Sequence, residues 1–106
     1  MSIANGKEQK GKPNLALLFR SFLVLTTRAR EHGLTKYGYD DFRKTTKIDI
    51  ISACLRHIFA DLDGEQIDPD SGLPHLAMAA GNLMLEIEKK YDKTHQVYPV
   101  AKSAKI

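Results

Sequence analysis

The stretch from Leu55 to Leu85, LRHIFADLDGEQIDPDSGLPHLAMAAGNLML, decides the fold of this chain. Apolar residues at helical spacing lie on both sides of an acidic connector, which is typical of two antiparallel helices. The connector, Asp63–Leu73, contains the turn-forming pairs Asp-Pro and Ser-Gly. Polar side chains are denser here than helix packing requires. The stretch therefore predicts a helical hairpin with a ligand site near its connector.

Caps and stop signals in the sequence set the bounds of the two hairpin helices and of one helix before them. We predict a first helix over Asn14–His32, a second over Thr46–Leu62 and a third over Gly72–Asp92. Gly33 is a standard helix stop, and Ser71 can cap the third helix. A short helical turn can form between the first two helices. No segment has a convincing strand pattern, so the sequence predicts an all-α fold, a small bundle of three main helices.

Each predicted helix has an apolar stripe that we expect to face the core. The stripes are formed by Leu15, Leu18, Phe19, Phe22, Leu25 and Ala29, by Ile48, Ile51, Leu55, Ile58, Phe59 and Leu62, and by Leu76, Ala80, Leu83, Met84, Ile87 and Tyr91. The first helix also has Leu17 and Val24 on its opposite side. A helix that is apolar on two sides needs two neighbours. We therefore expect oligomerisation to complete the bundle.

Charge and composition limit the classes of partner. The chain has 106 residues and a net charge of +3, but the lysine excess lies in a predicted flexible basic arm, 1–13, and a predicted C-terminal tail, 93–106. The domain between them, 14–92, is slightly acidic, so we expect no polynucleotide partner. No apolar run approaches the ~20 residues of a membrane span. A lone cysteine, Cys54, favours the cytoplasm, or the host cytoplasm if a phage encodes the chain.

Carboxylates crowd the connector. Glu65, Asp68 and Asp70 lie within six residues, and a divalent cation would relieve their mutual repulsion. The spacing excludes an EF-hand. The alternative is structural, because Asp and Ser in such a loop also form turns and cap helices without a metal.

Other polar residues could hold an anion or a base. Arg56 offers a planar fork for phosphate or a base edge, or else forms an ion pair with Asp49 or Asp63. Asn82 lies in the middle of a helix, where its amide needs a partner, either a base edge or a neighbouring helix. His75 lies near a helix start, where the dipole favours an anion.

Three more residues have two readings each. His57, next to Arg56, either takes part in the site or binds a loop carbonyl. Lys36 and Tyr37 could hold a phosphate and stack on a ring, or they could be ordinary surface residues.

Several of these residues form motifs that resemble one family. KYG at 36–38, RH at 56–57, GExxDPDSGLPHLA at 64–77 and AAxN at 79–82 resemble the dATP/dGTP diphosphohydrolase-like domain of phages and bacteria. This family is a relative of the all-α (MazG-like) nucleoside triphosphate pyrophosphatases. The resemblance implies an all-α oligomer, a purine (deoxy)nucleotide ligand, Mg²⁺ or Mn²⁺, and release of pyrophosphate. The matching positions are Lys36, Tyr37, Arg56, His57, Glu65, Asp68, Asp70, His75 and Asn82.

The chain departs from the family pattern at three places. Met78 stands where a second histidine is usual, and Asp41 and Phe42 replace the usual Asn-Trp pair. The paired helical acids, ExxE and ExxD, of the wider MazG-like superfamily are missing from the second and third helices.

Two main hypotheses result. In the first, Glu65, Asp68 and Asp70 hold the metal and act in catalysis, while the other matching residues bind the nucleotide. In the alternative, a non-catalytic protein sequesters a nucleotide-derived signal of host defence. A third class is an assembly protein with no ligand.

Overall fold

Three α-helices and two short 3-10 turns form the part of the chain that the computed structural model describes, residues 11–92. In chain order they are η1 (Leu15–Leu17), α2 (Arg20–Leu34), η2 (Asp41–Lys44), α3 (Lys47–Leu62) and α4 (His75–Tyr91). An isolated bridge between Ile67 and Pro74 is the only extended pairing within these residues. The predicted all-α fold is confirmed. The tail 93–106 and most of the arm 1–13 lie outside the described residues.

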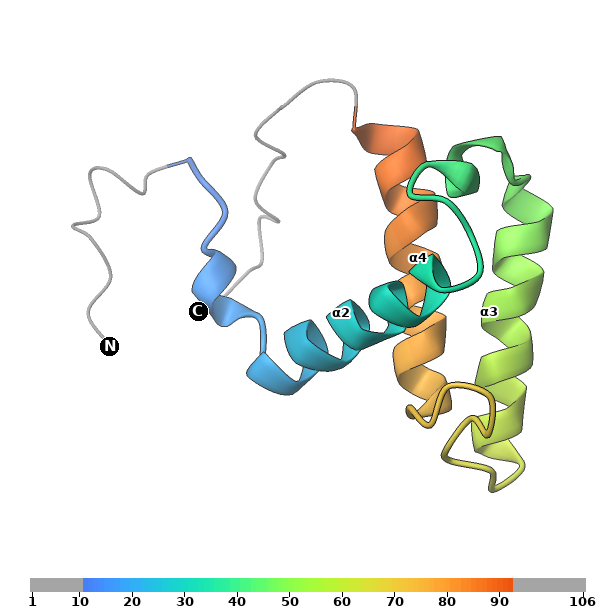
Figure 1. Cartoon of the computed structure of the whole chain (residues 1–106). Helices are drawn as coiled ribbons and strands as arrows, with labels where there is room; N and C mark the ends of the chain where they lie inside the picture. The colour runs from blue at the N-terminus through green and yellow to red at the C-terminus, as the bar shows by residue number, and fades with distance from the viewer. Residues whose placement is uncertain (1–10, 93–106) are drawn as a thin grey trace.

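The hairpin of α3 and α4 is the centre of the fold (Figure 1). The two helices lie side by side, and the acidic connector joins them at one end. The C-terminal half of α2 packs against α4, while its N-terminal half and η1 extend away from the hairpin. Within residues 11–92, no helix has the length and apolar character needed to span a membrane.

The first predicted helix differs from the observed one at both ends. Asn14 caps η1 by accepting a hydrogen bond from the Ala16 N–H, and the chain then runs extended through Leu18 and Phe19 before α2 begins. Most helical stability in proteins comes from packing, and the leucines of η1 are exposed. The predicted stop is also wrong, because Gly33 lies inside α2 and has no positive φ. The Thr35 hydroxyl instead binds the His32 carbonyl at the end of the helix.

The helix predicted over Thr46–Leu62 is confirmed, whereas the helix predicted over Gly72–Asp92 begins later than expected. The Thr46 side chain accepts the Asp49 N–H and caps α3, and η2 is the short turn expected before it. Ser71 does not cap α4, because its hydroxyl binds Asp68 and the Leu73 N–H inside the connector. Consequently α4 begins only at His75, whose N–H donates to the Gln66 carbonyl.

The core of the single chain is small. Its buried apolar residues are Ala29, Phe42, Ile50, Cys54, Ala77 and Ala79, and no large side chain is completely buried among the described residues. Small residues allow the helices to approach closely, and the Cys54 thiol lies 3.6 Å from the Ala79 carbonyl oxygen. Such a core offers little hydrophobic stabilisation on its own.

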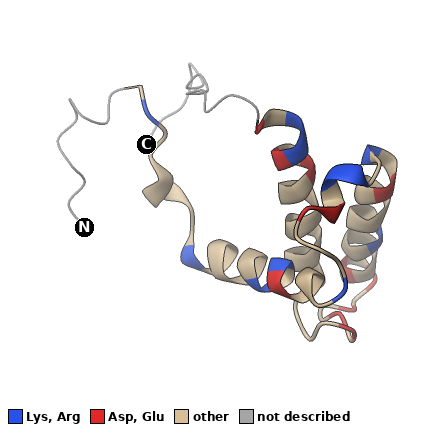
Figure 2. Cartoon of the chain, turned by 45° about the horizontal axis from the view of Figure 1, so that its top comes forward, with Lys and Arg blue, Asp and Glu red and all other residues tan. Residues whose placement is uncertain are grey.

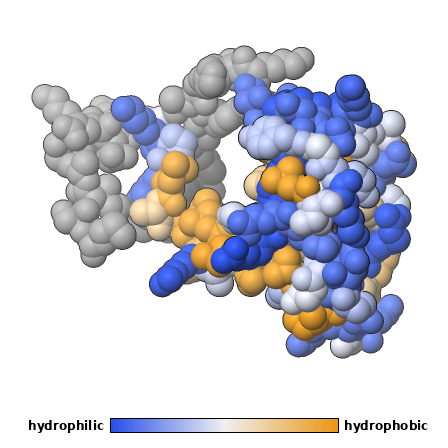
Figure 3. Space-filling model, viewed as in Figure 1, coloured by the Kyte–Doolittle hydropathy of each residue, from blue (hydrophilic) through white to orange (hydrophobic). Residues whose placement is uncertain are grey.

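The predicted apolar stripes lie mostly on the outside, contrary to expectation. On α3 the exposed large residues are Ile48, Leu55, Phe59 and Leu62, which we call the α3 apolar face. On α4 the exposed large aliphatic residues and methionine are Leu76, Leu83, Met84 and Ile87, which we call the α4 apolar face. Apolar side chains also cover much of the projecting part of α2 (Figure 3). The inward sides of the helices instead carry small and polar residues.

Gly81 of α4 packs tightly against Ala29 of α2. A Cβ atom there would lie 3.3 Å from the Ala29 Cβ, whereas one at Gly33 would meet nothing within 4 Å. We expect Gly81→Leu to lower the free energy of unfolding by about 1–3 kcal/mol through overpacking. Gly33→Ala should raise it by about 0.4–1 kcal/mol, because alanine favours the helix. Urea unfolding measures both, and equal effects at the two positions would contradict this packing.

Candidate functional site

A cavity of about 480 Å³ lies where α2, the connection after it, and the α3–α4 hairpin meet. Its volume falls within the ~300–1,000 Å³ typical of small-molecule sites. Seven of the nine predicted site residues line it: Lys36, Tyr37, Arg56, His57, Asp68, Asp70 and Asn82. Glu65 and His75 do not reach the wall. The tertiary structure therefore brings residues from four separate segments to one place.

Arg56 and Asn82 line the cavity. Within residues 11–92, neither has the structural partner that was the alternative hypothesis, an ion pair for Arg56 and a bond to a neighbouring helix for Asn82. The Arg56 guanidinium donates to the Ser52 hydroxyl at 3.0 Å, and no carboxylate pairs with it in residues 11–92. The predicted pairs with Asp49 and Asp63 are thus not formed. Asn82, which is half-buried, makes no side-chain hydrogen bond within the same residues. Both groups are available to a ligand.

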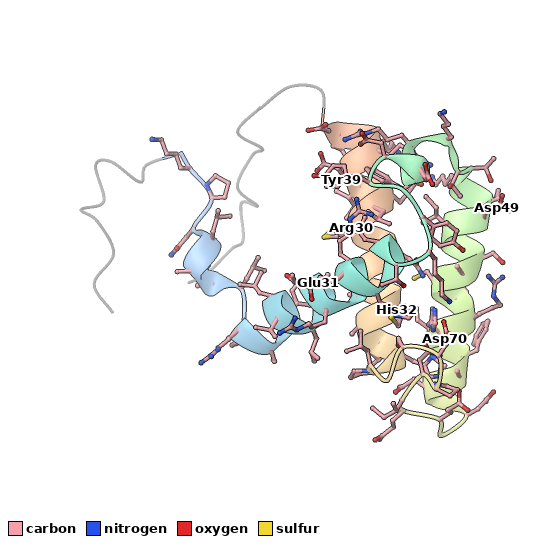
Figure 4. The ribbon with its side chains drawn as sticks, viewed as in Figure 1. Arg30, Glu31, His32, Tyr39, Asp49 and Asp70 are labelled. Carbon is pink, nitrogen blue, oxygen red and sulfur yellow. The ribbon has the colours of Figure 1, made fainter. Side chains whose placement is uncertain are left out.

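Arg30 and His32 line the cavity as well, and sequence reasoning missed them. Arg30 donates to the Tyr39 carbonyl at 2.5 Å and lies over the Tyr39 and Phe42 rings, 5.0 and 5.4 Å from their centroids. Figure 4 shows Arg30 and Tyr39 together at the C-terminal end of α2. The sequence signal that could have found Arg30 and His32 is their position in the last turns of α2, directly before the KYG motif.

Asp70 joins the connector to the end of α2. Its carboxylate binds the Lys36 ammonium and lies 3.3 Å from His32 Nε2, as Figure 4 shows for His32 and Asp70. The hydrogen bond from Lys36 makes the largest contribution to lowering the pKa of Asp70, and the hydrogen bond from His32 lowers it further. The same hydrogen bond raises the pKa of Lys36. An incoming phosphate must therefore share Lys36 with Asp70 or displace it.

Asp68 organises the connector. The buried carboxylate accepts hydrogen bonds from the Asp70 N–H at 3.2 Å and the Ser71 hydroxyl at 2.8 Å. Its own N–H donates to the Leu73 carbonyl, and its carbonyl accepts from Gly72, which has φ near +73°. Asp68 therefore has the turn-forming role that was the structural alternative to a metal site in the acidic loop.

The charge of Asp68 stabilises the fold above acidic pH. Burial raises its pKa, but the hydrogen bonds from Ser71 and the Asp70 N–H outweigh burial and lower it overall. A lowered pKa gives stability that is present above the unfolded-state pKa of ~3.9 and is lost as pH falls through the folded value. We expect Asp68→Asn to cost about 1–3 kcal/mol at neutral pH and less in acid. Urea unfolding at pH 7 and pH 3 tests this, with Asp63→Asn as control; an equal cost at both values would contradict it.

Glu65, His75 and His57 form a hydrogen-bonded chain from the surface to the cavity. His75 Nε2 lies 2.7 Å from the Glu65 carboxylate, and His75 Nδ1 lies 2.8 Å from His57 Nδ1. His75 is buried, whereas the Glu65 side chain is 59% exposed. Burial lowers the pKa of His57, and the charge of Asp68 only partly opposes this. His75 thus contacts the cavity only through His57, and not as the phosphate ligand that was predicted.

The three predicted metal ligands do not come together as a cluster. Glu65 binds His75, Asp68 binds Ser71 and a backbone N–H, and Asp70 binds Lys36 and His32. Within residues 11–92, no group of three His, Cys, Asp or Glu side chains is placed to hold a metal ion. The arrangement therefore does not fit a metal held jointly by Glu65, Asp68 and Asp70.

Fold and site together define an all-α domain with a polar cavity where its helices meet. The family model described as "dATP/dGTP diphosphohydrolase, N-terminal" matches residues 2–96. The chain belongs to this family, so the resemblance seen in its motifs is confirmed. No curated protein and no solved structure gives a significant match to the chain.

Proposed function

We propose that this domain binds a purine (deoxy)nucleoside triphosphate in the cavity and acts as a diphosphohydrolase, releasing pyrophosphate and a monophosphate. The observation that carries the proposal is the convergence of Arg56, Asn82 and Tyr37 on one cavity, where Arg56 pairs with no carboxylate of residues 11–92 and the Asn82 amide makes no hydrogen bond within them. A guanidinium suits phosphate, a carboxamide suits a base edge, and an aromatic ring suits stacking. The description of the family points to the same ligand class.

The charges on the cavity wall support a divalent cation that enters with the nucleotide. The wall has three permanent cations, Arg30, Lys36 and Arg56, and four carboxylates, Asp41, Asp49, Asp68 and Asp70. A triphosphate alone would add repulsion to such a wall. Mg²⁺ is commonly held by one or two carboxylates together with substrate phosphates. Asp49, whose carboxylate makes no hydrogen bond in the described residues, is the candidate for that contact.

A second candidate function is binding without hydrolysis. It is favoured by a specific observation, that the three acids expected to act on the phosphates are engaged with other partners. In that case the domain would sequester a purine nucleotide or a nucleotide-derived signal, such as one used in host defence. The cytoplasm is the compartment we propose for either activity, in keeping with the single buried thiol.

We also propose that the domain acts as a homo-oligomer. The α3 and α4 apolar faces and the projecting half of α2 leave extensive apolar surface uncovered in a single chain. Monomeric proteins rarely expose such continuous patches. Most soluble oligomers are built from identical chains, so we propose that a second copy of this chain covers these apolar faces.

One experiment separates the two candidate functions. The protein is incubated with dATP, dGTP or GTP and Mg²⁺ or Mn²⁺, and pyrophosphate release and thermal stability are measured in parallel. Turnover supports the diphosphohydrolase. Stabilisation by about 10 °C at saturating nucleotide without turnover supports sequestration. Neither turnover nor stabilisation with any purine nucleotide contradicts both.

A further inference from the structure

The chain of hydrogen bonds from Glu65 through His75 to His57 has a fixed polarity. A carboxylate only accepts hydrogen bonds, so His75 Nε2 must carry the proton that it shares with Glu65. Neutral His75 then has a lone pair on Nδ1, and His57 Nδ1 must donate to it. The remaining nitrogen of neutral His57 is therefore an acceptor.

We propose that Glu65 and His75 are positioning residues that hold His57 in the tautomer protonated at Nδ1, so that His57 Nε2 accepts a hydrogen bond from the ligand in the cavity. His57 lines the cavity, and its only side-chain hydrogen bond in the described residues is the one to His75. Neither Glu65 nor His75 lines it. Their influence on a ligand must pass through the His57 ring.

The groups around His57 favour this neutral form. Burial most strongly disfavours a second proton on the ring, the charge of Arg56 disfavours it as well, and the charge of Asp68 favours it. The Asp68 carboxylate accepts hydrogen bonds from the Asp70 N–H and the Ser71 hydroxyl, and no hydrogen bond joins it to His57 within residues 11–92. Within residues 11–92 no donor reaches Nε2, so we assign its hydrogen bond to the ligand.

The chemistry of that donor follows from the lone pair. Phosphate oxygens are acceptors and would be repelled by it, so His57 does not bind the phosphates. The exocyclic amino group of a purine base is a matching donor. Resting on the proposed function, the inference assigns His57 to recognition of the base, which would favour aminated purines over a purine without that group.

The substitution that tests the chain is Glu65→Lys. Lysine can only donate, so it would reverse the polarity of both bonds and leave His57 protonated at Nε2. Glu65→Gln keeps an acceptor oxygen and is the conservative variant. Asp63→Lys brings the same change of charge to an exposed position of the same loop and is the control. Because Glu65 is exposed, none of these changes disturbs the core.

The first measurement needs no ligand. Ring ¹⁵N NMR of the full chain, with the His57 and His75 signals assigned by single His→Gln variants, reports which nitrogen carries the proton. We expect protonated Nδ1 on His57 and protonated Nε2 on His75 in the wild type, Glu65→Gln and Asp63→Lys, with both reversed in Glu65→Lys. A wild-type His57 protonated at Nε2, or no reversal in Glu65→Lys, overturns the proposal.

The second measurement compares dATP with the deoxynucleoside triphosphate of unsubstituted purine, which lacks the amino group. We expect wild type, Glu65→Gln and Asp63→Lys to bind dATP about three- to tenfold more tightly, and Glu65→Lys to lose this preference. A preference unchanged in Glu65→Lys overturns the role of His57 in base recognition. Correct tautomers without binding of either nucleotide support the hydrogen-bond chain, while they refute the proposed function and the assignment to a base.

Discussion

We expect Phe59→Asp to convert the proposed homo-oligomer into monomers with markedly lower thermal stability. Phe59 lies on the α3 apolar face and is 56% exposed in the single chain. If the chain worked alone, an exposed substitution would change stability by no more than about 0.5 kcal/mol. If a second copy covers this face, the new carboxylate is buried without a partner, at a cost of about 3 kcal/mol or more.

The same reasoning applies to the α4 apolar face, so Ile87→Asp is a second probe of assembly. Gln66→Asp is the matched control, because it adds the same carboxylate to an exposed position of the connector. Light scattering after size exclusion measures the mass, and melting curves at several protein concentrations measure coupled stability. A wild-type protein that is monomeric and melts at a temperature independent of concentration would rule out the assembly.

The small core makes this prediction a strong one. Half of the buried apolar side chains in residues 11–92 are alanines, and Phe42 and Ile50 are the largest. Apolar burial of this extent offsets little of the conformational entropy that the described residues lose on folding. We therefore expect the folded chain and the assembled chain to be the same species, as in obligate dimers.

If the domain binds a nucleotide as proposed, we expect Arg56→Ala to weaken this binding about 10- to 100-fold and to leave the fold intact. The guanidinium lines the cavity and has only the Ser52 hydroxyl as a partner in the described residues. Hydrogen bonds to a charged group contribute about 1.5–3 kcal/mol, which gives this range of affinity. Because the side chain is exposed in the free domain, its loss removes little packing.

Two further variants make the Arg56 experiment specific. Arg56→Lys keeps the charge but loses the planar fork, so we expect an intermediate loss. Arg28→Ala removes an arginine that pairs with Glu31 on the surface, away from the cavity, and should bind normally. Calorimetric titration with dATP and Mg²⁺ gives the three affinities. Full binding by Arg56→Ala would place the nucleotide elsewhere on the molecule.

Residue type and motif identified most of the candidate site. Arg56 and Asn82 stood out because a charged fork and a mid-helix amide need partners, and both reach the cavity. Arg30 and His32 were missed because membership of a cavity depends on where α2 crosses α4, and no local pattern encodes that crossing. Charged side chains lie mostly on the hairpin and on the connection before it, whereas the part of α2 between Arg20 and Arg28 has none (Figure 2).

The carboxylates show the limit of counting like charges. Their density in the connector predicted a shared metal, yet each is satisfied separately by a hydroxyl, an ammonium or an imidazole. Spacing along the chain says which groups are near, but it does not say which partners from other elements reach them first.

The sequence by itself determined that the chain is helical, roughly where its three helices lie and which family it belongs to, because capping, periodicity and motifs are local properties. Only the tertiary structure decided which side of each helix faces inward. A repeat of 3.6 residues shows that Phe59 and Leu62 share a face with Leu55, but not what that face meets. Here the polar and small sides meet each other around a cavity, and the apolar sides face outward.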